Sequence, residues 1–264
     1  MQITTFIDQM GRDVSIPFPP RRIISLVPSQ TELLFDLGLN NEIAGITRFC
    51  IHPSDGYKTK IKVGGTKKVN LNVIRNLNPD LIIGNKEEND EEQVRKLMEE
   101  FTVWMSDIKD LNGALQMISE VGKITRKHQK AEEIIKDIEN GFRDLQQQNL
   151  NTSCRIAYFI WKDPYIVAGT ETFIHDILIR SGWKNTVLTK RYPELRMKEI
   201  KSLKPDRIFL SSEPYPFKEK HIAEFREIYP NAKVLLVDGE MFSWYGSRLL
   251  KAPAYLQTLL EDAG

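Results

Sequence analysis

The sequence has few cysteines, no excess of charge of either sign and no long apolar run. Its two cysteines, Cys50 and Cys154, are too few for a disulfide scaffold in 264 residues, so we expect both thiols to stay reduced. The 37 basic and 36 acidic residues give a net charge of +1, which does not support a nucleic-acid or membrane-surface partner. No apolar stretch approaches the roughly 20 residues of a transmembrane helix.

The N-terminus also lacks an apolar segment. The residues MQITTFIDQMGRDV carry Asp8 and Asp13 and contain no apolar region of about 7–15 residues, so they are not typical of a signal peptide. We therefore expect either that an export signal has been removed or that the protein works in the cytoplasm.

One pattern occurs twice in the chain. LNPDLIIGNKEEN (77–89) and LKPDRIFLSSEPYPF (203–217) both read Leu-x-Pro-Asp, then an apolar run, then a polar cluster with glutamate. Apolar runs typical of strands (21–27 and 155–160) are each followed by a helical pattern, and the first helix begins with Ser29 and Glu32 at the spacing of a capping box. Strands alternating with helices predict an α/β fold of two similar lobes with mostly parallel sheets.

A single long helix is predicted between the two lobes. Its apolar residues follow a helical stripe: Ala131, Ile134, Ile135, Ile138, Phe142 and Leu145. A helix over 127–148 would be roughly 30 Å long, and it fits either an ordinary surface helix or a spacer connecting the lobes. We expect an N-terminal lobe over 1–126 and a C-terminal lobe over 149–264.

The polar clusters that follow the repeated strands indicate where a ligand binds. In open parallel sheets, ligands bind outside the carboxyl ends of the strands. Two lobes with matching loops at those ends predict a ligand cleft between the lobes.

Five segments resemble one family along nearly the whole chain, from about Thr5 to Leu260. They are RRIISLVPSQTELLFDLGL, GGTKKVNLNVIRNLNPDLIIGNKEEN, FIWKDPYIVAGTETFIHDIL, LKPDRIFLSSEPYPF and VDGEMFSWYGSR. They are similar to the substrate-binding proteins of iron-siderophore and cobalamin ABC importers, and most of all to the cobalamin-binding branch.

The resemblance implies two Rossmann-like lobes bridged by one long helix, and a function in transport without catalysis. It implies capture of cobalamin or a related corrinoid, or alternatively haem or a ferric siderophore, for delivery to an ABC importer permease. No permanent cofactor is implied. The implied location is the periplasm or cell envelope, and we expect a monomer.

The candidate ligand-binding residues are small, polar or aromatic side chains in loops that follow predicted strands. Loop aromatics and hydrogen-bond donors suit a flat macrocycle rimmed by amides. They are Ser29, Gln30, Phe49, Cys50, Thr66, Lys67, Glu87, Trp161, Glu213, Tyr215, Phe242, Trp244 and Arg248.

Two of these loops raise alternatives. Cys50 and His52 are residue types that bind cobalt or iron, but no second His or Cys cluster accompanies them, so we expect no directly bound metal. Glu87 and Glu213 are also compatible with an acid–base pair in a two-lobed enzyme. A cytoplasmic corrinoid or tetrapyrrole carrier is a further alternative.

The sequence departs from the family at three positions. The well-known cobalamin binder has tryptophan where Thr66 aligns, which favours a smaller corrinoid or an iron chelate here. The family's two permease-docking glutamates align with Asn72 and near Ser243, so neither docking residue is carried over.

Overall fold

The computed structural model describes residues 2–148 and 153–261, which divide into two compact units. The first unit comprises Met1–Ile108, Asn112–Asp137 and Tyr245–Arg248. The second comprises Lys109–Leu111, Ile138–Trp244 and Leu249–Gly264. A short C-terminal segment therefore belongs to the N-terminal unit.

The first unit alternates strands and helices. Its strands are β1 (Gln2–Ile7), β2 (Asp13–Phe18), β3 (Ile23–Ser25), β4 (Ile43–Ile46), β5 (Ile61–Lys62), β6 (Leu81–Asn85) and β7 (Val103–Ser106). Its helices are α1 (Pro28–Asp36), α2 (Ser54–Thr59), α3 (Leu71–Leu77), α4 (Glu91–Glu100) and most of α5 (Leu111–Ile124).

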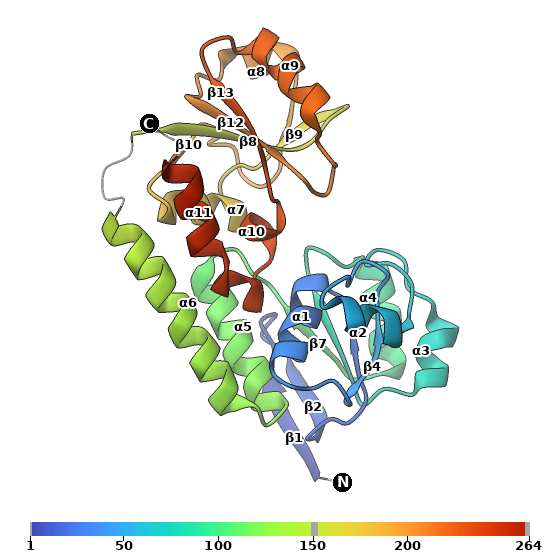
Figure 1. The fold of residues 1–264 in the computed structure, drawn as a ribbon. Coiled ribbons are helices and arrows are strands. Elements are labelled where there is room, and N and C mark those ends of the chain that lie inside the picture. The colour runs from blue at the N-terminus through green and yellow to red at the C-terminus, as the bar shows by residue number, and fades with distance from the viewer. Residues whose placement is uncertain (1, 149–152, 262–264) are drawn as a thin grey trace. The chain divides into compact units, whose positions relative to one another are not determined.

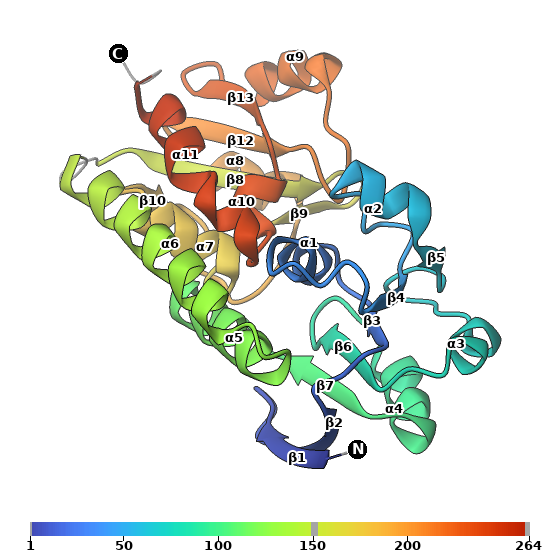
Figure 2. The same ribbon diagram turned by 60° about the horizontal axis from the view of Figure 1, so that its bottom comes forward.

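The main sheet of this unit is parallel, in the order β5-β4-β3-β6-β7. Alternate residues of a strand point to opposite faces. Ile24 and Ile82 pack with Ile74 of α3 and Leu97 of α4 on one face, while α1 covers the other face (Figure 2). The two covered faces explain why the strands are apolar on both sides.

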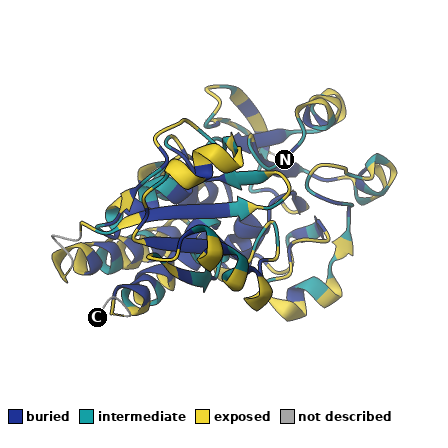
Figure 3. Ribbon diagram, turned by 90° about the horizontal axis from the view of Figure 1, so that it is seen from above, coloured by how far each residue is buried: buried dark blue, intermediate teal, exposed yellow. Residues whose placement is uncertain are grey.

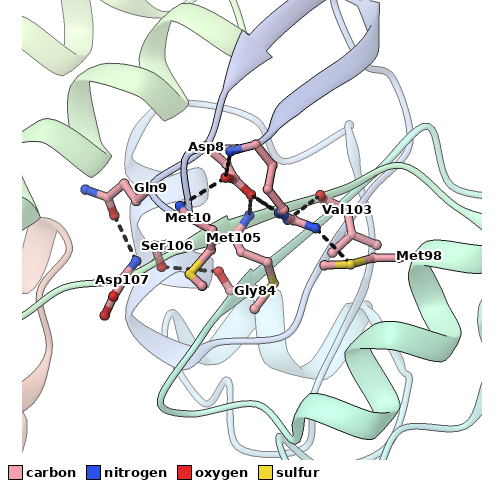
Figure 4. A network of polar contacts seen from close by, with 10 residues as sticks. Asp8, Gln9, Met10, Gly84, Met98, Val103, Met105, Ser106 and Asp107 are labelled. Atoms are coloured by element: carbon pink, nitrogen blue, oxygen red, sulfur yellow. Dashed lines mark hydrogen bonds and ion pairs between the residues drawn. The ribbon is translucent and has the colours of Figure 1, made fainter.

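An antiparallel hairpin of β1 and β2 precedes this sheet. The Asp8 carboxylate accepts hydrogen bonds from the backbone N–H groups of Met10 (3.0 Å) and Arg12 (2.9 Å), and from the guanidinium of Arg12 (Figure 4). The backbone N–H of Met105 in β7 also donates to Asp8, at 3.3 Å. One buried carboxylate thus closes the hairpin turn and joins it to the edge of the sheet.

The second unit has the same alternation. Its strands are β8 (Arg155–Trp161), β9 (Tyr165–Val167), β10 (Lys184–Asn185), β11 (Glu194–Leu195), β12 (Arg207–Ser211) and β13 (Lys233–Val237). Its helices are α7 (Phe173–Arg180), α8 (Met197–Ser202), α9 (Glu219–Ile228), α10 (Glu240–Ser243), the 3-10 helix η1 (Ser247–Leu250, begun in the first unit) and α11 (Ala252–Glu261).

Its sheet runs β11-β9-β8-β12-β13, with β10 also paired to β8. The strands β8, β12, β13 and β10 are parallel, whereas β9 is antiparallel to its neighbours. One face packs against α8 and α9 through Ile200 and Phe225. The other face carries an aromatic cluster of Tyr158, Phe209 and Phe242. The helices α8 and α9 lie on one side of the sheet and α7, α10 and α11 on the other (Figure 1), and the central strands are buried (Figure 3).

The predicted long helix is confirmed as α6 (His128–Gln148), 21 residues without a break. Its predicted apolar positions Ala131, Ile134, Ile138, Phe142 and Leu145 are buried. The boundary between the two units falls inside this helix, between Asp137 and Ile138.

The repeated Leu-x-Pro-Asp pattern has the same structural role in both units. The carboxylate of Asp80 accepts from the N–H of Arg22 at 3.0 Å, and the N–H of Asp80 donates to the Arg22 carbonyl at 2.9 Å. Asp206 makes the same reciprocal pair with Arg155, at 2.8 Å in each direction. Each aspartate thus aligns the strand it precedes, β6 or β12, with the start of the neighbouring parallel strand, β3 or β8.

One local prediction is wrong. Helix α1 begins at Pro28 with Val27 as the N-cap, and no side chain caps it. The Glu32 carboxylate instead binds Arg248, so the Ser29–Glu32 spacing is not a capping box. Among the described helices, none is both long enough and apolar enough to cross a membrane.

Candidate functional site

The loop that follows β3 leads directly into α1 and holds the first two candidates. Ser29 and Gln30 are almost fully buried. The amide nitrogen of Gln30 donates to the hydroxyl of Ser106 at 2.6 Å. A Cβ atom at Gly246 would lie 2.3 Å from the Ser29 carbonyl oxygen, so that close approach requires glycine. Both candidates thus lie in the packed interior at the carboxyl end of β3.

The loop after β4 separates an exposed ring from a buried thiol. The ring of Phe49 is 53% exposed, and the guanidinium of Arg48 lies 5.7 Å from its centroid. Cys50 is fully buried, with its sulfur 3.1 Å from the hydroxyls of Thr31 and Thr47. Burial raises the pKa of the Cys50 thiol. Phe49 is therefore available to a ligand, whereas Cys50 has a packing role.

Two further loops of the first unit are tied together. The side-chain amide of Asn89 donates to the carbonyl of Thr66 at 2.9 Å, and the ammonium of Lys67 donates to the carbonyl of Glu87 at 2.7 Å. Asn85 supports the turn, because its side-chain oxygen accepts from the N–H of Glu87 at 2.8 Å. Because β3, β4 and β6 are parallel, these loops share the carboxyl edge of the sheet with Phe49.

A C-terminal tyrosine contacts the same edge. The hydroxyl of Tyr245 donates to the carboxylate of Glu88 at 2.5 Å, and burial followed by the charge of Glu88 raises the pKa of this tyrosine. Neither residue was among the candidates, because their separation of 157 residues leaves no local signal.

In the second unit, Trp161 ends β8 and is 38% exposed. The ring of Tyr215, from the loop after β12, packs edge-on against it with centroids 5.6 Å apart. Since β8 and β12 are parallel, both residues lie at one edge of the sheet. The structure thus brings together two of the four aromatic candidates of this unit.

Glu213 lies in the same loop, and its carboxylate is hydrogen-bonded to other side chains of the protein. The indole N–H of Trp244 donates to its carboxylate at 2.9 Å, and the hydroxyl of Ser243 donates at 2.8 Å. Burial raises the pKa of Glu213, against the opposing effect of those two bonds. This carboxylate therefore anchors the segment that follows α10.

Three further predicted ligand contacts are buried, and each contacts other residues of the protein. Phe242 is 0% exposed and lies within the aromatic cluster of the second unit. Trp244 is buried with its indole bound to Glu213, and Arg248 is buried with its guanidinium bound to Glu32. We do not carry these three residues, or Ser29, Gln30 and Cys50, into the proposed site.

A metal centre is not found in the described parts of the chain. Within residues 2–148 and 153–261, no three His, Cys, Asp or Glu side chains are grouped so that they could hold an ion. His52 and Cys50 accordingly form no cluster with a third ligand there.

Comparisons with known proteins agree with this architecture. The family described as "Periplasmic binding protein" matches residues 23–227. The chain is 24% identical over 214 residues to an uncharacterized ABC transporter substrate-binding lipoprotein, YvrC, of Bacillus subtilis, covering 77% of this chain and 68% of that protein.

Solved structures share the fold at low sequence identity. The periplasmic vitamin B12-binding protein BtuF of Vibrio cholerae aligns with a TM-score of 0.81 at 23% identity, covering 94% of this chain and 99% of that one. A periplasmic heme-binding protein of Pseudomonas aeruginosa aligns with a TM-score of 0.80 at 19% identity, covering 93% and 94%.

Proposed function

Because the chain belongs to the periplasmic binding protein family, we propose that it is the solute-binding component of an ABC importer. Its ligand is a corrinoid, a tetrapyrrole such as haem, or a ferric siderophore. The family and the relatives are binding proteins and do not favour an enzyme or a cytoplasmic carrier. We propose that the protein acts outside the cytoplasmic membrane, next to a permease.

The observation that carries this proposal is the exposure of two aromatic rings. Among the described phenylalanines and tryptophans, Phe49 and Trp161 are the exposed ones. Phe49 follows β4 and Trp161 ends β8, so each lies at the carboxyl end of a strand that has a parallel neighbour, where ligands of such folds bind. Burial of an exposed ring is favourable, and the face of a flat macrocycle would cover such a ring.

The polar residues beside Phe49 suit a ligand with acidic or amide groups at its edge. Arg48 lies over the Phe49 ring, and a Cβ atom at Gly65 would be 3.2 Å from that ring. Lys67 and Thr66 follow in the same loop, so we propose that they contact the ligand edge together with Glu87. Thr66 supplies no ring, which favours a smaller corrinoid or an iron chelate over cobalamin.

Calorimetry and absorption titrations with cyanocobalamin, dicyanocobinamide, haem and a ferric hydroxamate siderophore test the proposal. We expect saturable one-to-one binding of at least one compound, with a shifted absorption spectrum. Failure of the wild-type protein to bind any of the four would overturn the proposed ligand class.

The oligomeric state is tested separately. We propose a monomer that docks on a permease without the family's two docking glutamates, since these positions align with Asn72 and near Ser243. Asn72 accepts from Arg75, and Ser243 donates to Glu213. Sedimentation of the purified protein, with and without the bound ligand, should show one chain per particle.

A further inference from the structure

A buried histidine contacts Tyr215, one member of the aromatic pair in the second unit. His221, in the first turn of α9, is 4% exposed. Its Nδ1 lies 2.8 Å from the backbone nitrogen of Lys218, and its Nε2 lies 3.3 Å from the hydroxyl oxygen of Tyr215. The Tyr215 ring in turn contacts Trp161. A line of contacts therefore runs from the start of α9 to Trp161.

The hydrogen-bond partners determine which nitrogen of His221 carries the proton. A backbone N–H can only donate, so Nδ1 must accept from Lys218 and cannot be protonated. The neutral imidazole then carries its hydrogen on Nε2. That N–H donates to the hydroxyl oxygen of Tyr215, which acts as the acceptor.

This tautomer fixes the role of the tyrosine hydroxyl. Because its oxygen accepts from His221, its own hydrogen is directed to another acceptor. The ring is held in place by Phe217 (centroids 4.7 Å apart) as well as by Trp161, and its backbone N–H bonds to the carbonyl of Ile160. With its ring against Trp161, Tyr215 therefore has a hydroxyl hydrogen that it can donate to a ligand lying on that indole.

We propose that His221 is a positioning residue that orients Tyr215 as a donor to an oxygen acceptor of the ligand. The acceptor is a carbonyl, a carboxylate or a metal-chelating oxygen at the edge of a molecule whose face covers Trp161. This inference rests on the proposed function, because it assumes that Trp161 contacts the ligand.

Protonation of His221 breaks the arrangement. A proton on Nδ1 would face the N–H of Lys218, and two donors cannot share a hydrogen bond. That backbone bond caps the start of α9, so helix α9 and the position of Tyr215 would both be perturbed. Ligand affinity should therefore fall as His221 becomes charged.

Burial and two nearby cations favour the uncharged form of His221 by lowering its pKa. Burial lowers its pKa, and Lys162 and Lys220 lower it further, whereas Glu224 acts in the opposite direction. The Glu224 carboxylate is itself engaged by the ammonium of Lys162 and by the hydroxyl of Tyr165, the latter at 2.6 Å. The pKa of His221 is therefore lower than that of a free histidine.

Ligand titrations of three proteins test the inference: wild type, Tyr215→Phe and His221→Gln. Glutamine at this position of a helix can accept from the Lys218 N–H and donate to Tyr215, and it does not titrate. The probe is whichever of cyanocobalamin, dicyanocobinamide, haem or the ferric hydroxamate siderophore binds the wild type most tightly at about pH 7.5, and each titration is repeated at successively lower pH while the protein stays folded.

We expect Tyr215→Phe to weaken binding about fivefold to tenfold at pH 7.5, the effect of one lost hydrogen bond. Wild-type affinity should fall once the pH is low enough to charge His221, and the affinity of His221→Gln should not fall over the same range. Unchanged binding by Tyr215→Phe, or a wild-type pH dependence in His221→Gln, would overturn the inference while leaving the proposed function intact.

A measurement without ligand separates the two proposals. Nitrogen-15 NMR of the histidine rings at pH 7.5 should show His221 unprotonated at Nδ1 and protonated at Nε2. The opposite tautomer overturns the inference directly. If the wild type binds none of the four probes, the proposed function fails, and the ligand contact of Tyr215 fails with it.

Discussion

Glu32 and Arg248, separated by 216 residues, form a buried ion pair within the first unit. The guanidinium Nε and Nη2 lie 2.9 Å and 2.8 Å from the two carboxylate oxygens. The neighbouring Ser247 donates to Asp36 at the end of α1. The segment Tyr245–Arg248 is thereby attached to α1.

Arg248→Ala should destabilise the first unit strongly. The side chains of Arg248 and Glu32 are only 7% and 10% exposed, so removing the arginine leaves a buried carboxylate without its cation. We expect a loss of about 3–5 kcal/mol in the free energy of unfolding. Urea denaturation followed by circular dichroism measures it.

The control replaces both partners of the pair. In Glu32→Leu combined with Arg248→Met, no charge remains buried, and the loss should be much smaller than in Arg248→Ala. A double variant as unstable as the single one would show that the packing of the arginine, not its charge, holds the segment.

Trp161→Ala should weaken ligand binding about ten- to a hundredfold, because the covered indole face contributes roughly 1.5–3 kcal/mol. Calorimetry with the compound that the wild type binds measures the change. Ile179→Ala is the matched control: Ile179 is an exposed apolar residue on the last turn of α7, in the same unit. Equal effects of the two substitutions would argue against Trp161 as a ligand contact.

Glu213→Gln should change how stability depends on pH. Burial raises the pKa of Glu213 in the folded protein, so the folded state holds this proton more tightly than the unfolded state does. The favourable contribution is fully present below about pH 4.5 and is lost as the pH rises through the folded pKa.

Glutamine stays uncharged at every pH of this range, and its side-chain oxygen can still accept from Trp244 and Ser243. We therefore expect Glu213→Gln to be the more stable protein at neutral pH, with a flatter profile between pH 4.5 and 7 in thermal unfolding. A variant less stable than wild type at pH 7 would contradict the assignment of a costly buried charge.

The two thiols should differ in reactivity. Cys50 is buried and Cys154 is partly exposed, and the thiolate reacts only where reagent can reach it. With a disulfide reagent that releases a coloured thiolate, we expect Cys154 to react in the native protein and Cys50 only on unfolding. Cys154→Ser should then show no native-state reaction, and rapid colour from that variant would place Cys50 at the surface.

The strands and the long helix could be predicted because their signals are local. The stripe from Ala131 to Leu145 has the period of a helix, and the run at 155–160 matches β8 (Arg155–Trp161). The Leu-x-Pro-Asp repeat also marked equivalent places, because a proline ends the preceding helix and the aspartate bonds to the neighbouring strand.

The N-terminal hairpin was missed. Its alternation over Gln2–Ile7 is weak because both Ile3 and Ile7 are exposed. The hairpin is held by the Asp8 carboxylate, whose bond to Met105 spans 97 residues. A bond of that separation cannot be read from local sequence.

The site was predicted less well than the fold, for one reason. Residue type indicates that an aromatic or charged side chain has a specific role, but not whether its partner is a ligand or the protein itself. Phe49 and Phe242 both stand in loop or helix-start sequences, yet the first is exposed and the second lies in the core. His221 was not among the candidates, because its contacts with Tyr215 and Lys218 depend on how the start of α9 folds.

The repeated aspartates give the molecule its own matched comparison. Asp80 and Asp206 make the same reciprocal backbone pair, but Asp80 also accepts from the N–H of Arg21 at 2.7 Å, whereas Asp206 also binds the guanidinium of Arg155 at 2.8 Å. The difference between the effects of Asp80→Asn and Asp206→Asn therefore compares an added backbone hydrogen bond with an added ionic contact. The repeated pattern thus allows the two kinds of aspartate contact to be compared within one protein.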